Sequence, residues 1–271
     1  MQPFFSIIIP TLNEELFVNK ILGDLAKQKV KNFELIVVDG NSQDKTQQMI
    51  LSYKKEMPIT LLKMNPPNLP LQKNLGAKQA KSPYLLFLDA DMSVSPSFTG
   101  VAERLIKKKQ GLVFQPYVFP LEKGDYQEFN AIYPFINKLI EFSQNFNKPF
   151  SAGPAMFWER KAFLTIGGFD NIFGEDHQII RKAHNWGIRP KFLSRLKVLF
   201  SLRRMKKEGR LLSLYKLLYS HLYLLFNEKM KKKIITYEMG GHLYKHLDEQ
   251  RSKEDFIPRI KKIFRSILLE Q

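Results

Sequence analysis

Two aspartates separated by one residue, Asp89 and Asp91, follow the short apolar run Tyr84–Leu88. Carboxylates this close repel each other unless a cation or hydrogen-bond donors offset their charge. Mg²⁺ and Mn²⁺ prefer oxygen ligands, and carboxylates often hold such ions together with substrate phosphates. The pair therefore indicates a divalent metal site, for Mg²⁺ or Mn²⁺, with Asp91 and Asp89 as ligands. Taken alone, so short a pattern also fits one aspartate that caps a turn beside a solvated one.

Polar residues follow two further apolar runs, Phe4–Ile9 and Phe33–Val38. The first run is followed by the segment Pro10–Glu14, and the second by Asp39. Near-continuous apolar runs are typical of strands buried on both faces of a parallel sheet. In open sheets of this kind, ligands bind beyond the carboxyl ends of the strands. These two positions and the aspartate pair are therefore the places to seek a site.

The first 115 residues alternate between apolar runs and amphipathic stretches. Strands are expected at Phe4–Ile9, Phe33–Val38, Ile59–Lys63 and Tyr84–Leu88, and helices at Glu14–Gln28, Asp44–Lys55 and Leu71–Lys81. Thr11 and Glu14 have the spacing of a capping box, which predicts that the first helix begins directly after the first strand. Ser95 and Pro96 are expected to begin another helix. This βαβαβαβ order predicts a Rossmann-like α/β layer.

The remainder of the chain is mixed and then basic. Helices are expected near Glu128–Asn145 and Glu175–Asn185, and a helical basic part from about Leu202. The net charge is +17. From Arg189 to the end there are 21 Lys or Arg and 8 Asp or Glu, whereas the first 188 residues have 22 and 18. A charge excess at one end predicts an anionic partner, such as phospholipid headgroups, nucleic acid or a polyanionic acceptor.

The apolar segment Leu211–Phe226 is the longest candidate for contact with a membrane. A helix of this length reaches about 24 Å, short of the roughly 30 Å hydrocarbon core. The lysine-rich stretch 229–233 follows it, which suits a helix lying on anionic lipid. Packing on the core or on a second copy is the other interpretation. With no cysteine and no basic leader, we expect a cytoplasmic protein held peripherally on the membrane.

Taken together, the polar segments resemble the family 2 glycosyltransferases of the GT-A fold. Matching motifs occur in the family's order and cover roughly residues 4 to 205. They are Pro10-Thr11-Leu12-Asn13-Glu14, Val37-Val38-Asp39-Gly40-Asn41-Ser42-Gln43-Asp44-Lys45-Thr46, Lys73-Asn74-Leu75-Gly76-Ala77, Phe87-Leu88-Asp89-Ala90-Asp91, Gly167-Gly168-Phe169-Asp170 and Gly174-Glu175-Asp176. The resemblance implies a mixed, mostly parallel sheet flanked by helices, followed by a basic helical C-terminal extension.

The resemblance also implies roles for individual residues. Asp91 would be the direct metal ligand, Asp89 would help to hold the ribose and the metal, and Asp176 would be the catalytic base. The predicted donor-binding residues are Pro10, Thr11, Asn13, Glu14, Asp39, Lys73, Asp89, Arg203 and Arg204. The two arginines are predicted from the suitability of arginine for phosphate and not from the resemblance. Contact with an anionic acceptor and a solvated or lipid-facing turn are the other interpretations of these two residues. Asp39 would accept a hydrogen bond from the nucleobase. Lys73 stands where the family usually has arginine, so it keeps the positive charge but loses the bidentate fork.

The implied reaction is inverting transfer of one sugar from a nucleotide-sugar donor to an acceptor hydroxyl. The acceptor would be a lipid-linked or other cell-envelope glycan. Polymerising relatives carry Gln-x-x-Arg-Trp, which neither Trp158 nor Trp186 fits, so a single, non-processive transfer is expected. Residues 1–205 would form the transferase domain, with a nucleotide-binding part (1–115) and an acceptor-binding part (116–205). Residues 206–271 would form the extension.

Two other classes of protein combine some of these features. A nucleotidyltransferase also places metal carboxylates on a Rossmann-like layer, but it normally has a Gly-rich phosphate loop after the first strand, and Thr11–Glu14 contains no glycine. A catalytically inactive membrane or nucleic-acid adaptor would use the basic tail and leave the carboxylates unexplained. Nucleic acid is therefore not expected as a partner, while the sugar, the base and the oligomeric state stay open.

Overall fold

Four parallel strands form the N-terminal half of the central sheet. They are β1 (Phe5–Thr11), β2 (Phe33–Asp39), β3 (Ile59–Lys63) and β4 (Tyr84–Phe87). β1 lies between β2 and β4, and β3 is at the edge beside β2. The structure is a computed structural model that describes residues 3–122, 127–151, 153, 155–172, 174–209 and 240–244. The four strands predicted from their apolar runs are confirmed.

The second half of the sheet mixes strand directions. It contains β5 (Met92–Val94), β6 (Val113–Pro120), β7 (Met156–Glu159) and β8 (Lys191–Phe200). The full strand order is β3-β2-β1-β4-β7-β6-β8-β5. β7 runs antiparallel to β4 and β6, β5 runs antiparallel to β8, and β6 and β8 are parallel. The predicted mixed, mostly parallel α/β sheet is therefore confirmed.

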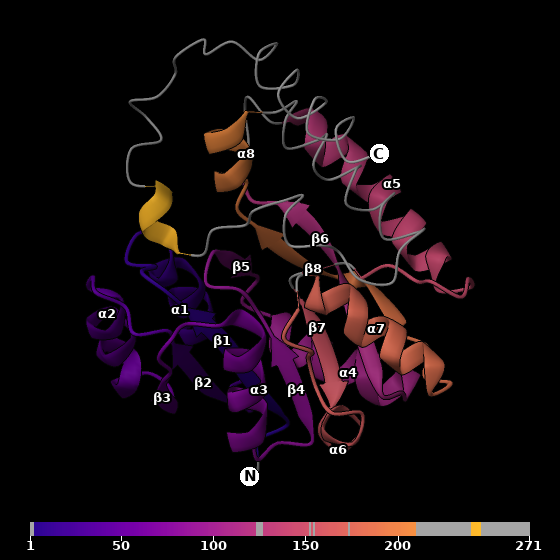
Figure 1. Ribbon diagram of the computed structural model, residues 1–271, viewed down its shortest axis with the longest axis horizontal. Coiled ribbons are helices and arrows are strands. Elements are labelled where there is room, and N and C mark those ends of the chain that lie inside the picture. The colour runs from indigo at the N-terminus through magenta and orange to yellow at the C-terminus, as the bar shows by residue number, and fades with distance from the viewer. Residues whose placement is uncertain are drawn as a thin grey trace, which may run out of the picture.

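Helices cover both faces of this sheet (Figure 1). The described helices and short 3₁₀ turns are α1 (Val18–Ala26), α2 (Thr46–Ser52), η1 (Tyr53–Lys55), α3 (Leu69–Gln79), α4 (Phe98–Lys109), α5 (Gln127–Ser143), α6 (Arg160–Thr165), α7 (Glu175–Asn185), α8 (Arg203–Glu208) and η2 (Gly241–Tyr244). Side chains of α1, α2 and α4 join one hydrophobic cluster, those of α3, α6 and α7 join a second, and those of α5 join a third, smaller one.

The alternation within β1 explains how one apolar run serves both clusters. Ile7 and Ile9 belong to the cluster with α1 and α4, whereas Ile8 belongs to the cluster with α3 and α7. Successive side chains of a strand point to opposite faces, so a strand covered on both sides needs apolar residues at every position. This burial holds the carboxyl end of β1 rigidly at the edge where the polar segments begin.

The prediction of a capping box after β1 is wrong. Thr11 is the last residue of the strand, and α1 begins only at Val18 without a side-chain cap. The Thr11 hydroxyl donates instead to Asp39, and the Glu14 carboxylate accepts from Arg203. Charged and buried partners far along the chain therefore outcompete the local backbone N–H groups.

Two other predicted helix starts also differ from the structure. α4 begins at Phe98 rather than at Ser95-Pro96, and its N-cap residue makes no side-chain hydrogen bond. α3 begins earlier than the periodicity indicated, because the Asn68 side chain caps it by accepting from the Leu71 N–H at 3.1 Å. The helices predicted at Glu128–Asn145 and Glu175–Asn185 correspond to α5 and α7.

The predicted helix Leu211–Phe226 and the lysine stretch 229–233 lie outside the described residues. Within the described ranges, none of the helices has the length and hydropathy needed to cross a membrane. The division into residues 1–205 and 206–271 stays a prediction.

Candidate functional site

The site begins where β1 and β2 end side by side. Thr11 and Asp39 are paired residues in the register of these strands, and the Thr11 hydroxyl donates to Asp39 Oδ2 at 2.9 Å. The buried Gln72 side chain of α3 donates to the carbonyl oxygens of Thr11, at 3.0 Å, and of Val38, at 2.8 Å. These bonds fix the two strand ends and the helix that follows β3 to one another.

Asp39 organises the loop after β2. Its buried carboxylate accepts from the Ser42 N–H at 2.8 Å, the Ser42 hydroxyl at 2.6 Å and the Gln47 side chain at 2.8 Å. With the bond from Thr11, both oxygens already have two protein donors. The predicted contact between Asp39 and a nucleobase is not tested by these bonds and stays a prediction. Gln47 is a further candidate for that contact, because it lies beside the same carboxylate.

Asn13 joins three segments of the chain. Its backbone has a left-handed φ of 50°, its N–H donates to the Ser42 hydroxyl at 2.8 Å, and its side-chain oxygen accepts from the Gln43 N–H at 2.8 Å. The Asn13 amide nitrogen also lies 3.1 Å from Nδ1 of His242. The loops after β1 and β2 and the segment 240–244 therefore meet at one residue predicted to bind the donor.

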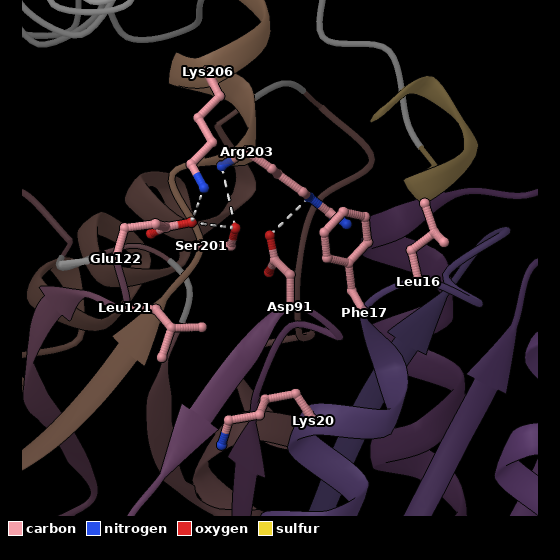
Figure 2. A pocket seen from close by; sticks show the side chains of 9 residues that line it. All are labelled: Leu16, Phe17, Lys20, Asp91, Leu121, Glu122, Ser201, Arg203 and Lys206. Atoms are coloured by element: carbon pink, nitrogen blue, oxygen red, sulfur yellow. Dashed lines mark hydrogen bonds and ion pairs between the residues drawn. The ribbon is translucent and has the colours of Figure 1, made fainter. Parts of the chain in front are cut away.

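Arg203 connects Glu14 to Asp91. Its two terminal nitrogens donate to the Glu14 carboxylate, and its Nε lies 2.9 Å from Asp91 Oδ2. The guanidinium carbon lies 4.5 Å from the centroid of the Phe17 ring and 4.9 Å from that of the Tyr244 ring, and the two rings contact each other edge to face. A planar guanidinium can use both its fork and its faces in this way, whereas a lysine could not. Figure 2 shows Arg203 reaching from α8 over Asp91 beside Phe17.

Burial and charge oppose each other at these groups. Burial raises the pKa of Glu14 and of Asp91, and the Arg203 guanidinium acts to lower both. Arg204 also lowers the pKa of Asp91, which places its charge near the site. Burial alone would lower the pKa of Arg203, but its hydrogen bond to Glu14 and the charge of Asp91 raise it. Arg203 is therefore the cation that balances this part of the site.

Asp89 has an unsatisfied oxygen. Burial raises its pKa to about 6, against the lowering effect of Lys73 and with a further increase from Asp91. Its Oδ1 is buried and has no hydrogen-bond partner in the described structure. Two carboxylates with one free buried oxygen fit a Mg²⁺ or Mn²⁺ ion that takes its other ligands from a substrate diphosphate and water. No described group of three or more His, Cys, Asp or Glu side chains is arranged to hold a metal.

Lys73 forms a buried ion pair with Glu175. Its ammonium lies 2.8 Å from Oε1 of Glu175, and only 4% of the residue is exposed. Burial would lower the pKa of Lys73, but Glu175 and Asp89 raise it well above its usual value. The pair joins α3 to the first turn of α7. The predicted role of Lys73 in binding a donor phosphate stays a prediction. Its ammonium contacts Glu175, and the charges of Asp89 and Asp176 also raise its pKa.

Asp176 lies in the first turn of α7, after Gly174 with its left-handed φ of 74°. The residue is half-buried, and its carboxylate faces Gly153, where an added Cβ would be 3.4 Å from Oδ2. The neighbouring His177 accepts at Nδ1 from the Ser151 N–H at 3.1 Å. His177 thus holds Ser151, in the loop before β7, opposite the predicted base.

A cavity of about 230 Å³ opens beside Asp91 (Figure 2). Its lining residues are Leu16, Phe17, Lys20, Asp91, Leu121, Glu122, Ser201, Arg203 and Lys206. Glu122 accepts from the Ser201 hydroxyl at 3.0 Å and lies 3.5 Å from the Lys206 ammonium.

The predicted residues at the ends of β1, β2 and β4 are thus brought together with Arg203. Phe17, Gln72, Glu122, Glu175 and Tyr244 are further site residues that the motifs did not identify as functional.

The family model for glycosyl transferase family 2 matches residues 6–167. The chain is 35% identical over 91 residues to the poly(ribitol-phosphate) beta-N-acetylglucosaminyltransferase TarS of Staphylococcus aureus, which is 32% of this chain and 16% of TarS. It is 24% identical over 244 residues to the GalNAc(5)-diNAcBac-PP-undecaprenol beta-1,3-glucosyltransferase of Campylobacter jejuni, covering 76% of this chain and 77% of that enzyme. The match therefore spans only about a sixth of TarS.

Solved structures share the fold at low sequence identity. The mannosyltransferase PcManGT of Pyrobaculum calidifontis, in complex with GDP-Man and Mn²⁺, superposes with a TM-score of 0.60 at 17% identity, over 73% of this chain and 57% of that one. TarS residues 1–349 in complex with UDP-GlcNAc give 0.56 at 21% identity, over 74% and 58%. The sheet with its carboxylates at the strand ends is thus the GT-A fold, and the chain belongs to glycosyl transferase family 2.

Proposed function

We propose that this protein transfers one sugar from a nucleotide-sugar donor to an acceptor hydroxyl with inversion at the anomeric carbon. The observation that carries the proposal is the aspartate pair at the end of β4, with Asp89 Oδ1 buried and unpaired next to Asp91. An unpaired buried carboxylate oxygen is costly, so its retention favours a bound cation in the working state. Family membership supports a transferase as the user of that cation.

The donor would lie across the ends of β1, β2 and β4. Pro10, Thr11, Asn13 and Asp39 would bind the nucleoside, because they form the rigid corner between the first two strands. The positive charges that face the same region are Lys73, Arg203 and Arg204, and they would bind the diphosphate. Mg²⁺ or Mn²⁺, held by Asp91 and Asp89, would offset the charge that develops on the departing diphosphate.

Asp176 would act as the general base. It would remove the proton from the acceptor hydroxyl while that oxygen attacks the anomeric carbon, and the bond from this carbon to the diphosphate would break on the opposite side. A single displacement of this kind inverts the anomeric configuration. The half-buried position of Asp176 in the first turn of α7 supports this role, since its carboxylate lies across from Gly153, where an added Cβ would be 3.4 Å from Oδ2.

The acceptor would be a cell-envelope glycan, carried on a lipid or bearing phosphate. The names of two relatives support this: one acts on poly(ribitol-phosphate) and the other on an undecaprenol-linked glycan. The net charge of +17 suits an anionic acceptor and an anionic membrane surface. The protein would then work peripherally on the cytoplasmic face of the membrane.

Calorimetric titration tests the donor site directly. The purified protein is titrated with a panel of nucleotide sugars, with and without Mn²⁺, beside Asp91→Asn and the exposed control Glu56→Gln. We expect one donor to bind only with Mn²⁺, with binding lost in Asp91→Asn and kept in Glu56→Gln. The anomeric configuration of the product, read by NMR, then tests inversion. If no donor binds under any condition, the transferase proposal is wrong and an adaptor role gains support.

A further inference from the structure

The outer face of α5 carries a stripe of exposed apolar side chains that the proposed site does not use. The stripe consists of Ile132, Phe135, Leu139, Phe142 and, just beyond the helix, Phe146. These residues are 47 to 69% exposed. Their spacing of three and four residues places them on one side of the helix. Five large apolar side chains in one row are characteristic of a docking surface rather than of scattered surface residues.

The opposite face of α5 already makes the contacts that hold the helix in place. The buried Asn137 side chain accepts from the Val118 N–H at 3.0 Å and donates to the Val118 carbonyl at 2.8 Å. Ile136 and Ile140 pack with Tyr117 of β6. α5 is therefore fixed to β6 by one face, and the stripe faces away from the sheet. Figure 1 shows α5 at the margin of the molecule, far from β1 to β3.

Two lysines flank this stripe on the side of β6 and β8. The Lys138 ammonium lies 5.9 Å from the centroid of the Tyr117 ring, and the Lys197 ammonium lies 4.9 Å from that of Phe119. Both lysines are exposed. Glu141 pairs with Lys138 at 3.4 Å without burying it. Lysines whose stems lie along aromatic rings and whose ammonium groups reach solvent are suited to the headgroup level of a membrane.

We propose that the α5 stripe docks onto the surface of an anionic lipid bilayer. Phe135, Leu139 and Phe142 enter the interface, while Lys138 and Lys197 face the anionic headgroups. Charge complementarity favours this partner, since the two exposed lysines beside the stripe, Lys138 and Lys197, suit anionic headgroups. A second copy fits less well, because Lys138 lies beside the stripe and two-fold pairing of α5 would bring this lysine close to its own copy.

The docking would set the position of the active site relative to the membrane. β6, which α5 clamps, continues into Leu121 and Glu122, and these line the cavity beside Asp91. A hydroxyl on a lipid-linked glycan would thus be presented from the side on which the stripe lies. This consequence rests on the proposed function, whereas membrane binding by the stripe does not.

Vesicle cosedimentation of the full chain tests the stripe. Vesicles of phosphatidylcholine with phosphatidylglycerol are compared with phosphatidylcholine alone, for the wild type and for Phe135→Ser/Phe142→Ser. The matched control, Leu51→Ser/Leu112→Ser, removes two exposed apolar side chains elsewhere. We expect the stripe variant to lose about tenfold or more of its partitioning onto anionic vesicles, the control to match the wild type, and Lys138→Gln/Lys197→Gln to lose only the preference for anionic lipid.

A second measurement uses a variant that keeps a large apolar side chain in the stripe. Phe142→Trp places an indole in the stripe, and its emission is expected to shift to the blue when anionic vesicles are added. Equal sedimentation of the wild type and the stripe variant, or no shift in emission, would overturn the proposal. A wild-type dimer that becomes monomeric in the stripe variant, measured by light scattering, would assign the stripe to self-association instead. Donor binding measured on the same samples separates failure of the proposed function from failure of the docking.

Discussion

Arg203 occupies the position beside Asp91 that a metal ion would also favour. It lies 2.9 Å from Asp91 Oδ2 and donates two hydrogen bonds to Glu14. A divalent ion that binds Asp91 must therefore compete with the guanidinium. Removal of Arg203 leaves the carboxylates without their cation, so metal binding in the absence of nucleotide should become stronger even though the diphosphate loses a partner.

The first prediction concerns this competition. Arg203→Gln should bind Mn²⁺ alone more tightly than the wild type, by about tenfold, the equivalent of one partly buried ion pair of about 1.4 kcal/mol. Arg195→Gln, at an exposed position away from the aspartate pair, is the control for the loss of one positive charge from the protein. Mn²⁺ binding followed by electron paramagnetic resonance measures both variants. Weaker or unchanged binding in Arg203→Gln would mean that Arg203 does not compete for Asp91.

The second prediction follows from the pKa of about 6 for Asp89. Because this pKa lies above the value of 3.8 for the unfolded chain, the native state binds the proton of Asp89 more tightly. Protonation of Asp89 therefore stabilises the native state most below about pH 4. That stabilisation is lost as the pH rises through 6. Asp89→Asn removes the buried charge, so in metal-free buffer it should gain about 1–3 kcal/mol of unfolding free energy relative to the wild type at pH 8.

Urea unfolding at pH 4 and pH 8, with a chelator present, measures this difference. The gain from Asp89→Asn should shrink or vanish at pH 4, where the wild-type carboxyl is neutral. Glu56→Gln, an exposed carboxylate, should show no such dependence. A loss of stability in Asp89→Asn at pH 8 would contradict this prediction, because it would mean that the ionised carboxylate stabilises the native state.

At the scale of the elements, the Lys73–Glu175 pair joins α3 to α7 and thereby positions the turn that carries Asp176. Lys73→Met would leave the Glu175 carboxylate buried without a cation, which should cost about 3–5 kcal/mol of unfolding free energy. Lys73→Met/Glu175→Gln should recover part of this loss. Lys182→Met removes the more exposed pair with Asp170 and should cost about 1 kcal/mol or less.

Urea unfolding of these variants gives the coupling energy of the pair. Additive losses in the double variant would show that Lys73 stabilises the protein through packing rather than through Glu175. Donor affinity of Lys73→Met, measured in parallel, tests the other predicted role of this lysine. If donor affinity falls in Lys73→Met but not in Lys73→Arg, the positive charge at position 73 also contacts the phosphates.

The elements that the sequence predicts correctly are those with a strong local pattern. The apolar runs of β1, β2, β3 and β4 are continuous because helices cover both faces, so each run is visible without any partner. β5 has three residues and exists through pairing with β8, about a hundred residues further along the chain. No local pattern predicts such a strand. The capping box failed for a similar reason, since the partners of Thr11 and Glu14 are distant.

The candidate site divides in the same way. The carboxylates at strand ends were predictable, because the motif order and the rule on carboxyl ends both point to them. The partner of each charge was not, since Arg203 reaches Glu14 across 189 positions and Lys73 reaches Glu175 across 102. Sequence therefore identifies which groups gather, and the structure identifies which of them neutralise one another.

At the scale of the whole molecule, the segment 240–244 closes over the loop after β1 from far along the chain. The Gly241 N–H donates to the Leu12 carbonyl at 3.1 Å. An added Cβ at Gly241 would lie 2.6 Å from the carbonyl oxygen of Asn13 and 2.7 Å from Oε2 of Glu14. Both distances are too short for a side chain, so only glycine permits this approach. The contact also brings Tyr244 onto the Arg203 guanidinium.

The last prediction uses this close approach. Gly241→Ala should displace the segment, and faster amide hydrogen exchange should appear in 240–244, because the Gly241 N–H loses the Leu12 carbonyl. The amides of Asn13 and Glu14 donate to Ser42 and Thr46 and should keep their protection. Gly209→Ala, which has a left-handed φ but nothing within 4 Å of the added Cβ, controls for backbone strain alone. Exchange followed by mass spectrometry distinguishes the two. If Gly241→Ala leaves the segment 240–244 protected, the contact with Leu12 does not hold this segment in place, and Arg203 keeps its position through Glu14, Asp91 and Phe17.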